Sequence, residues 1–174
     1  MIRIESESPN DVTAREELLD RAMGKARVTK PSERLRAGRL PAEGLALVAR
    51  NGDRLAGSVR LWHVAAGGRP ALLLGPLTID PALQGRGVGA GLIEVALARA
   101  ALAGHRAVIL VGDPDYYERF GFARPPLRRL HMPGPVDRRR FLGVELAAGS
   151  LAALEGQVIG AGAPDRFSDF RSLA

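Results

Sequence analysis

The chain of 174 residues contains no cysteine. This absence excludes a disulfide framework, a thiolate nucleophile and a cysteine-ligated metal. Aromatic residues make up only 5% of the chain, so few side chains could stack on the bases of a nucleic acid. The three histidines, His63, His105 and His131, lack the close spacing of zinc ligands, and we expect no bound metal.

Long hydrophobic runs are also absent. No apolar stretch reaches the roughly 20 residues that a transmembrane helix needs, and residues 1–5 lack the apolar core of a signal peptide. We therefore expect a soluble, cytoplasmic protein without a membrane partner. The hydrophobic fraction of 46% is sufficient for a sizeable core, and no repeat or linker divides the chain. Residues 1–174 are expected to form one domain.

The formal net charge of +6 comes mostly from arginine. A basic surface can attract nucleic acid or a small polyanion such as a nucleotide cofactor, and a general abundance of arginine explains the same charge. The run Asp137-Arg138-Arg139-Arg140 could meet RNA or an acidic acceptor, but charge runs usually form a solvated face. Because no RNA-binding motif accompanies the charge, we expect no nucleic-acid partner.

The first half of the chain has the pattern of helices followed by an antiparallel meander. Thr13 and Glu16 form a predicted capping box at the start of a helix, and Pro31 opens a shorter one. Asn51-Gly52 predicts a type I′ hairpin turn, because both residues accept positive φ. The expected strands of this half cover residues 1–4, 45–50, 55–64 and 71–79.

The second half alternates between strands and helices. A helix over residues 88–103 ends at Gly104, and the strand–helix–strand order predicts that strands 72–79 and 108–111 are parallel neighbours. The sequence therefore predicts an α/β fold with a mixed sheet of six or seven strands and helices on both faces. The remaining expected segments are a short helix at 115–120, a proline-rich loop at 124–135 and a last strand at 141–146.

Three glycines, Gly85, Gly87 and Gly89, lie between the 72–79 strand and the following helix. Glycine lets the backbone turn sharply and approach a ligand closely. The first turn of a helix also presents unpaired N–H groups and partial positive charge, so this loop predicts a phosphate site, to which Arg86 can add a full charge. A plain glycine-rich turn is the alternative.

The same loop partly matches the fingerprint of dinucleotide-binding folds. Gly85-x-Gly87-x-x-Ala90 has the required spacing, and Asp113 lies where the ribose-binding acid would follow. The context argues against this interpretation, because residues 80–84 separate the strand from the first glycine. An antiparallel meander precedes the loop, and too little chain follows it for a substrate domain.

Pro76 interrupts the strand that precedes the glycine loop. Proline cannot donate a ladder hydrogen bond, so Gly-Pro within a strand indicates a bulge or an edge. If the two parallel strands separate here, they open a V-shaped slot that the free backbone groups of Leu77 and Ile79 face. An extended ligand with amides could pair in this slot like an added strand. An ordinary edge strand is the alternative.

These two segments resemble the GNAT family of N-acetyltransferases. Gln84, Gly87, Gly89 and Ala90 match the family's cofactor motif, in which a glutamine or arginine and two residues precede Gly-x-Gly-Gly/Ala. Residues 116–122 resemble its second signature, a tyrosine four residues before Gly-Phe. The combination of Leu-Gly-Pro, Gly-Asp-Pro-x-Tyr-Tyr and Arg-Phe-Gly-Phe is similar to the YhbS-like branch. The resemblance is close over residues 45–122 and fainter elsewhere.

The resemblance implies a GNAT-like acyl-CoA N-acyltransferase fold with acetyl-CoA as cosubstrate. It implies direct acetyl transfer, in a ternary complex, to the primary amine of a small molecule or a protein, by a monomer or homodimer. Tyr117 would stand near the cofactor sulfur as the general acid that protonates the departing thiolate; a packing role for Tyr117, or the use of Tyr116, are the alternatives. The implied cofactor-binding residues are Leu77, Thr78, Ile79, Gln84, Gly85, Arg86, Gly87, Val88, Gly89, Ala90 and Tyr117.

One departure from the family pattern concerns the general base. Many relatives carry a glutamate on the strand equivalent to 72–79, which has no acidic residue here. Deprotonation of the amine must then go through water or use a residue from elsewhere. Glu33, Glu43, His63 and Asp113 are unranked candidates, and for each a solvated or hydrogen-bonded residue without a catalytic role is the alternative. The missing glutamate also leaves open a second interpretation, a CoA-binding sensor or interaction module without turnover. The 124–135 loop and the N-terminal helices are expected to shape the acceptor site.

Overall fold

The computed structural model describes residues 1–124 and 127–167. Within these residues, seven strands form one mixed sheet in the order β1-β2-β3-β4-β5-β7, with β9 paired to β3. The strands of this sheet are β1 Ile2–Ser6, β2 Ala46–Asn51, β3 Arg54–Ala66, β4 Arg69–Ile79, β5 Ala107–Val111, β7 Phe141–Glu145 and β9 Ile159–Gly160. The four α-helices of the described chain are α1 Val12–Met23, α2 Pro31–Arg36, α3 Val88–Leu102 and α4 Pro114–Tyr117.

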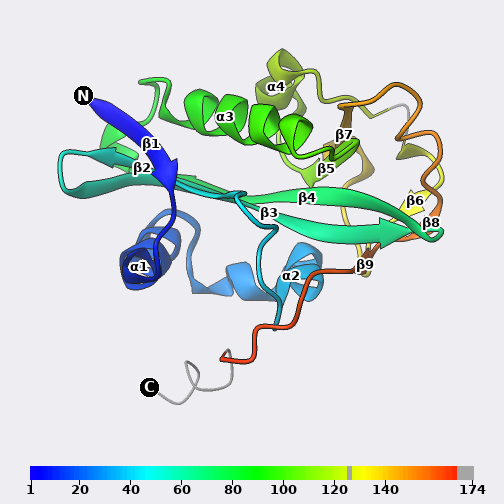
Figure 1. Cartoon of the computed structure of the whole chain (residues 1–174), viewed down its shortest axis with the longest axis horizontal. Helices are drawn as coiled ribbons and strands as arrows, with labels where there is room; N and C mark the ends of the chain where they lie inside the picture. Colours follow the sequence, from blue (N-terminus) through cyan, green and yellow to red (C-terminus); the bar gives the residue numbers. More distant parts are fainter. Residues whose placement is uncertain (125–126, 168–174) are drawn as a thin grey trace.

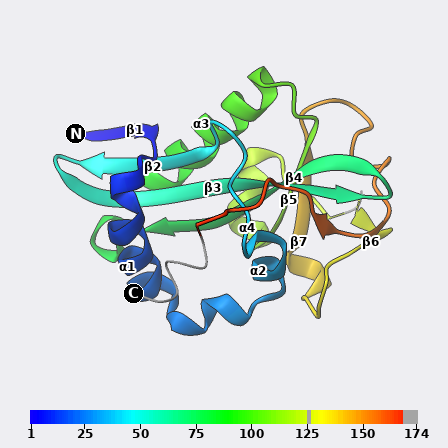
Figure 2. The same ribbon diagram turned by 60° about the horizontal axis from the view of Figure 1, so that its bottom comes forward.

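Helices cover both faces of the sheet. In Figure 1, α3 lies along one face, while α1 and α2 lie against the other. Figure 2 shows the segment that links α1 to α2 running beneath the same face. The predicted mixed sheet with helices on both faces is therefore confirmed. No helix within the described residues is long and apolar enough to cross a membrane.

Two hydrophobic clusters hold the layers together. Side chains alternate between the faces of a strand, and on β3 Leu61 joins the cluster under α3 while Trp62 joins the cluster on the opposite face. From α3, Leu92 and Ala96 are completely buried against the first cluster. Residues 108–111 are all apolar because helices and loops cover both faces of the sheet, so successive side chains of this strand pack into apolar layers on either side.

Two predicted local features are wrong. Thr13 does not cap α1; instead Ser8 donates its backbone N–H to the Asp11 carboxylate at 2.8 Å, one turn earlier. The hairpin between β2 and β3 is not a type I′ turn, because Gly52 has a φ of 62° and no residue other than glycine has positive φ within the described chain. A positive φ at the first central residue alone is the pattern of a type II′ turn.

The 124–135 segment is only partly a surface loop. Leu127, Leu130 and Met132 are buried in the cluster that contains Trp62. Strand β6 (Leu130–His131) pairs in parallel with β8 (Gly156–Gln157), as a separate two-stranded sheet. Two prolines of this proline-rich segment, at 125 and 126, lie outside the described residues. The middle of this segment thus serves the core, which its proline-rich composition did not indicate.

Candidate functional site

Strands β4 and β5 diverge near the middle of the sheet. They are parallel, as predicted, but pair only at Leu72 with Val108 and at Leu73 with Ile109. Beyond these pairs β4 continues to Ile79 without a partner on the β5 side within the described residues. The V-shaped slot expected from the sequence is therefore present.

A bulge in β4 marks the start of the slot. Across the β3–β4 pairing, Val59 lies opposite Leu77 and Leu61 lies opposite Leu74, so Gly75 and Pro76 have no regular partners. The buried indole of Trp62 donates its Nε1–H to the Gly75 carbonyl oxygen at 2.6 Å and satisfies the acceptor that the bulge releases. The bulge was predicted from Pro76, whereas the role of Trp62 was not.

The backbone groups of Leu77 and Ile79 point into the slot. The N–H of Asp80 donates to the Ala56 carbonyl at 2.8 Å, which makes these two residues a hydrogen-bonded pair. Antiparallel pairs alternate, so Ile79 with Gly57 and Leu77 with Val59 are non-hydrogen-bonded pairs whose N–H and C=O groups face away from β3. An extended chain in the slot could pair with both residues.

The glycine loop and the start of α3 form one wall of a first cavity of about 590 Å³. Gly85 and Gly87 have φ values of 75° and 79°, which side-chain-bearing residues rarely adopt. Within the described residues, the N–H groups of Val88, Gly89 and Ala90 make no backbone hydrogen bond, as the first turn of a helix requires. The predicted residues that line this cavity are Leu77, Thr78, Ile79, Gln84, Gly85, Gly87, Val88, Gly89 and Ala90.

Arg86 and Tyr117 do not line the first cavity. Arg86 is exposed on the loop, next to the cavity wall. In place of Tyr117, the neighbouring Tyr116 contributes to the wall, because adjacent residues of a helix project about 100° apart. The two adjacent tyrosines of the motif therefore have different surroundings.

Sequence reasoning missed the contribution of Tyr116 and Arg119 to the first cavity. The Tyr116 hydroxyl lies so close to Gly89 that a Cβ on this glycine would be 2.6 Å from it. The Arg119 guanidinium lies 4.7 Å from the centroid of the Tyr116 ring, and its Nε donates to the Tyr116 carbonyl at 3.0 Å. The spacing of three residues within a predicted helix could have placed both on one side.

Tyr117 lines a second cavity of about 420 Å³, which meets the first at Met23 and Leu77. Its ring packs so closely on Gly112 that a Cβ there would lie 2.4 Å from Cε2. Burial, the largest cause, raises the pKa of the Tyr117 phenol to about 12, and Tyr116 adds to the rise. The Tyr117 hydroxyl makes no hydrogen bond within the described chain, so its proton is available to a ligand.

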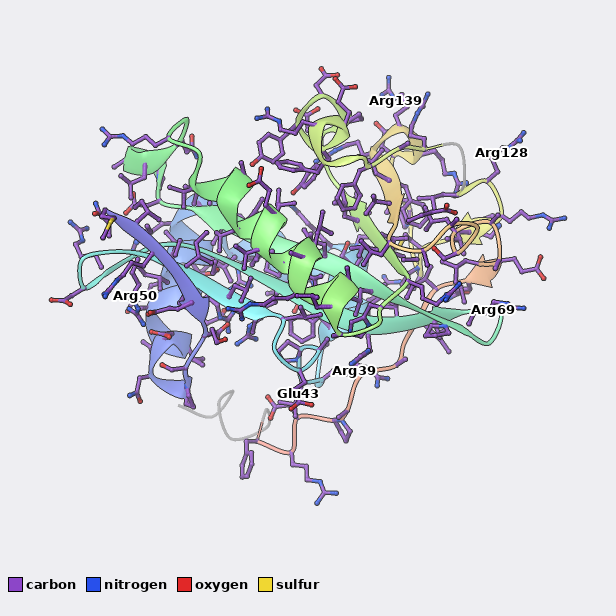
Figure 3. All side chains as sticks on the ribbon, turned by 45° about the horizontal axis from the view of Figure 1, so that its top comes forward. Arg39, Glu43, Arg50, Arg69, Arg128 and Arg139 are labelled. Atoms are coloured by element: carbon purple, nitrogen blue, oxygen red, sulfur yellow. The ribbon has the colours of Figure 1, made fainter. Side chains whose placement is uncertain are left out.

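The structure separates the four candidates for the general base. Asp113 lines the second cavity. Glu33 lies 3.5 Å from Arg36 behind it, and His63 packs against His105 at a ring-centroid distance of 5.5 Å. Glu43, which is labelled near the lower edge of the molecule in Figure 3, is exposed and lines neither cavity. Of the four, only Asp113 contacts the cavity that Tyr117 lines.

In the described residues, no three histidine, aspartate or glutamate side chains are grouped so that they could hold a metal ion. The polar groups of the two cavities are instead helix N–H groups, strand backbone, two phenols, two carboxylates and several arginines. This set can bind phosphates and an extended amide-bearing chain, and it can transfer protons at the junction of two cavities.

Comparison with known proteins gives a consistent result. The family model described as an acetyltransferase (GNAT) domain matches residues 42–124. A search of the curated proteins found no match. Among solved structures, the GNAT family N-acetyltransferase YhbS from Escherichia coli, in complex with CoA, is 28% identical, with a TM-score of 0.78; the alignment covers 92% of this chain and 89% of that chain.

Two further structures extend the comparison. A GNAT family acetyltransferase from Brucella melitensis, in complex with acetyl-CoA, is 27% identical with a TM-score of 0.70, over 92% of this chain and 96% of that chain. The ribosomal-protein-S18-alanine N-acetyltransferase from Escherichia coli is 17% identical with a TM-score of 0.60, over 84% and 95% of the two chains. This last likeness shows the fold alone. The acyl-CoA N-acyltransferase fold predicted from the motifs is confirmed.

Proposed function

We propose that this chain, whose residues 42–124 match a GNAT acetyltransferase domain and whose fold is similar to that of YhbS, transfers an acetyl group from acetyl-CoA directly to a primary amine. The observation that carries the proposal is the meeting of two cavities at Leu77. One cavity has the chemistry of a phosphate and pantetheine site. The other contains a carboxylate and a protonated phenol, the groups that an acyl transfer to an amine requires.

Acetyl-CoA occupies the first cavity in this proposal. The N–H groups of Val88, Gly89 and Ala90 bind the pyrophosphate at the positive end of the α3 dipole. Arg119, and Arg86 from outside the cavity, add positive charge. The pantetheine amides pair with the free backbone groups of Leu77 and Ile79, which brings the thioester to the junction of the two cavities. The family pattern and two neighbours solved with CoA or acetyl-CoA support this placement.

The acceptor amine enters through the second cavity. Its nitrogen attacks the thioester carbonyl carbon, while Asp113 takes a proton from it, directly or through a water molecule. The C–S bond then breaks and Tyr117 transfers its phenolic proton to the sulfur. The products are the N-acetyl amine and the free thiol of CoA. Asp113 releases its proton to solvent, and Tyr117 recovers a proton from solvent. No covalent acyl-enzyme is needed, in agreement with the absence of cysteine.

Two measurements test this function. Titration calorimetry should show that CoA and acetyl-CoA bind in a one-to-one ratio. A panel of primary amines, screened by release of the CoA thiol and by mass spectrometry of the products, should contain acceptors that become N-acetylated. Tight CoA binding without turnover on any amine would favour the sensor interpretation. Absence of CoA binding would contradict the proposal altogether.

A further inference from the structure

The second cavity contains charged side chains of both signs. Asp113 and Asp137 line it together with Lys30, Arg36 and Arg140. Asp137 is already bound, since both of its carboxylate oxygens accept hydrogen bonds from Arg139. Asp113 accepts a bond from the Asp115 N–H on one oxygen, at 3.1 Å, and its other oxygen has no partner within the described residues. The cationic side chains of this cavity therefore outnumber the carboxylates that remain free to pair with a ligand.

Arg36 is the buried member of this set. The residue is 9% exposed, and its Nε has no hydrogen-bond partner in the described part of the chain. Its ion pair there is with the half-exposed Glu33, at 3.5 Å, a separation too long for a good hydrogen bond. A guanidinium that has lost most of its hydration without gaining partners raises the free energy of the empty protein.

Arg15 shows how the same chain pairs a buried arginine that serves the fold. Its side chain is 5% exposed, with Nε 3.1 Å from Glu7 and a second nitrogen 2.9 Å from Glu16. Two carboxylates thus compensate Arg15 at hydrogen-bond distance, whereas Arg36 has one carboxylate beyond it. The difference points to a missing partner for Arg36 rather than to a general tolerance of buried charge.

The position of Arg36 directs it to the reacting centre. It is the last residue of α2, next to the buried Leu35, which fixes the end of the helix. One of its terminal nitrogens lies 3.6 Å from the point that a Cβ on Gly75 would occupy. Gly75 begins the bulge that leads to Leu77, where the two cavities meet. A group bound to Arg36 is therefore close to the thioester proposed for that junction.

We propose that the acceptor is a primary amine that also carries an oxyanion, and that Arg36 binds this oxyanion. The inference rests on the proposed acetyltransferase function and names the acceptor class for that site. The fork of a guanidinium matches the two oxygens of a carboxylate or of a phosphonate. Asp113 lines the same cavity and has one carboxylate oxygen without a partner in the described residues. This carboxylate suits the ammonium end, so the two charges orient the amine toward the thioester.

The test uses matched acceptors with the intact protein. A series of ω-amino carboxylates of increasing chain length is compared with their primary amides and with the aminophosphonates of equal length. At the best length, kcat/KM for one of the anionic amines should exceed that of the amide by about 10- to 100-fold, the usual effect of a charge-assisted bond. The carboxylate and phosphonate arms show which oxyanion the site prefers.

Variants separate binding from folding. Arg36→Met should lower kcat/KM for the anionic amine to the value of its amide, and leave the amide and acetyl-CoA binding unchanged. Arg36→Lys should restore part of the preference. Arg34→Met, which removes an exposed arginine from the same helix, is the control. It should leave kcat/KM unchanged for both the anionic amine and its amide.

Three results would overturn the inference. Turnover of neutral amines with no preference for their anionic partners leaves the acetyltransferase function standing and removes the anion site. If Arg36→Met lowers kcat/KM equally for the anionic amine and for its amide, Arg36 has a purely structural role. Absence of thiol release with every amine contradicts the proposed function, and this inference fails with it.

Discussion

The two adjacent tyrosines show how one residue position decides a chemical role. Both are partly buried, but Tyr117 lines the cavity proposed for the acceptor, whereas Tyr116 lines the cavity proposed for acetyl-CoA. Burial raises the pKa of both phenols. Only Tyr117, however, is placed where the amine and the sulfur meet in the proposed reaction. The motif alone could not decide between a catalytic and a packing role for it.

Tyr117→Phe keeps the ring and removes the proposed acid. We expect kcat to fall by about 10²–10⁴-fold, the range of general acid catalysis, while the Michaelis constant for acetyl-CoA changes little. Tyr116→Phe should be mild. Because a phenol with a pKa of about 12 keeps its proton, wild-type kcat should not decline from about pH 7 to about pH 10. A loss below roughly threefold in Tyr117→Phe would mean that the thiolate leaves unaided.

The two buried arginines lead to opposite expectations for stability. Arg15→Met removes the contacts of Arg15 with Glu7 and Glu16, although Arg60 still pairs with Glu7 and Arg27 still pairs with Glu16. Loss of these charge-assisted contacts should lower the free energy of unfolding by about 2 kcal/mol. Arg36→Met removes a charge that burial already disfavours, so we expect a change within about 1 kcal/mol. Urea denaturation of both variants checks this. An equal loss in the two would mean that Arg36 is paired for the fold.

At the scale of elements, the turn into α3 combines two different uses of glycine. Gly87 has the positive φ that ends the loop, and a Cβ there would meet open space. Gly89 has ordinary helical backbone, but a Cβ there would be 2.6 Å from the Tyr116 hydroxyl. The sequence motif treats both as phosphate-binding glycines, whereas in the structure Gly89 also leaves room for a tyrosine from α4.

Gly89→Ala therefore tests the contact between α3 and α4. The new methyl group should displace the Tyr116 side chain toward the first cavity and weaken acetyl-CoA binding by roughly tenfold. Adding Tyr116→Phe removes the hydroxyl and should restore most of the affinity, because contacting residues couple by about 0.5–3 kcal/mol. Titration calorimetry of the two single variants and the double variant gives this coupling. Additive effects would show that Tyr116 does not mediate the loss.

The elements that the sequence predicted well are those with local signals. The glycine spacing and the helix that follows it lie within 20 residues of each other, and Pro76 indicated the bulge directly. For the acceptor site, the sequence indicated only the N-terminal helices and the 124–135 loop. It could not predict the second cavity itself, because α2, the β4 bulge, α4 and the segment before β7 come together only in three dimensions. Leu127, Leu130 and Met132 were assigned to a loop, since short buried segments next to prolines show no helix or strand period.

At the scale of the whole molecule, the arginines differ in how close they lie to the proposed acetyl-CoA site. Many of the exposed arginines, such as Arg69, Arg128 and Arg139, point into solvent far from the glycine loop (Figure 3). Arg119 instead lines the first cavity. A formal net charge of +6 attracts a polyanionic cosubstrate from any direction, while a charge beside the cavity acts where the polyanion binds.

The association of acetyl-CoA should therefore depend on salt. We expect its rate constant to fall by about tenfold as ionic strength rises from about 0.02 M to about 0.5 M, because screening shortens the reach of the field to a few ångströms. Pantetheine, which has no phosphates, should show no such dependence. Stopped-flow binding measures both.

Arg119→Gln should slow the association of acetyl-CoA at low salt more than Arg128→Gln, although the two variants change the net charge equally. Equal slowing would mean that net charge alone attracts the cosubstrate. A rate constant that does not depend on salt would contradict electrostatic attraction entirely.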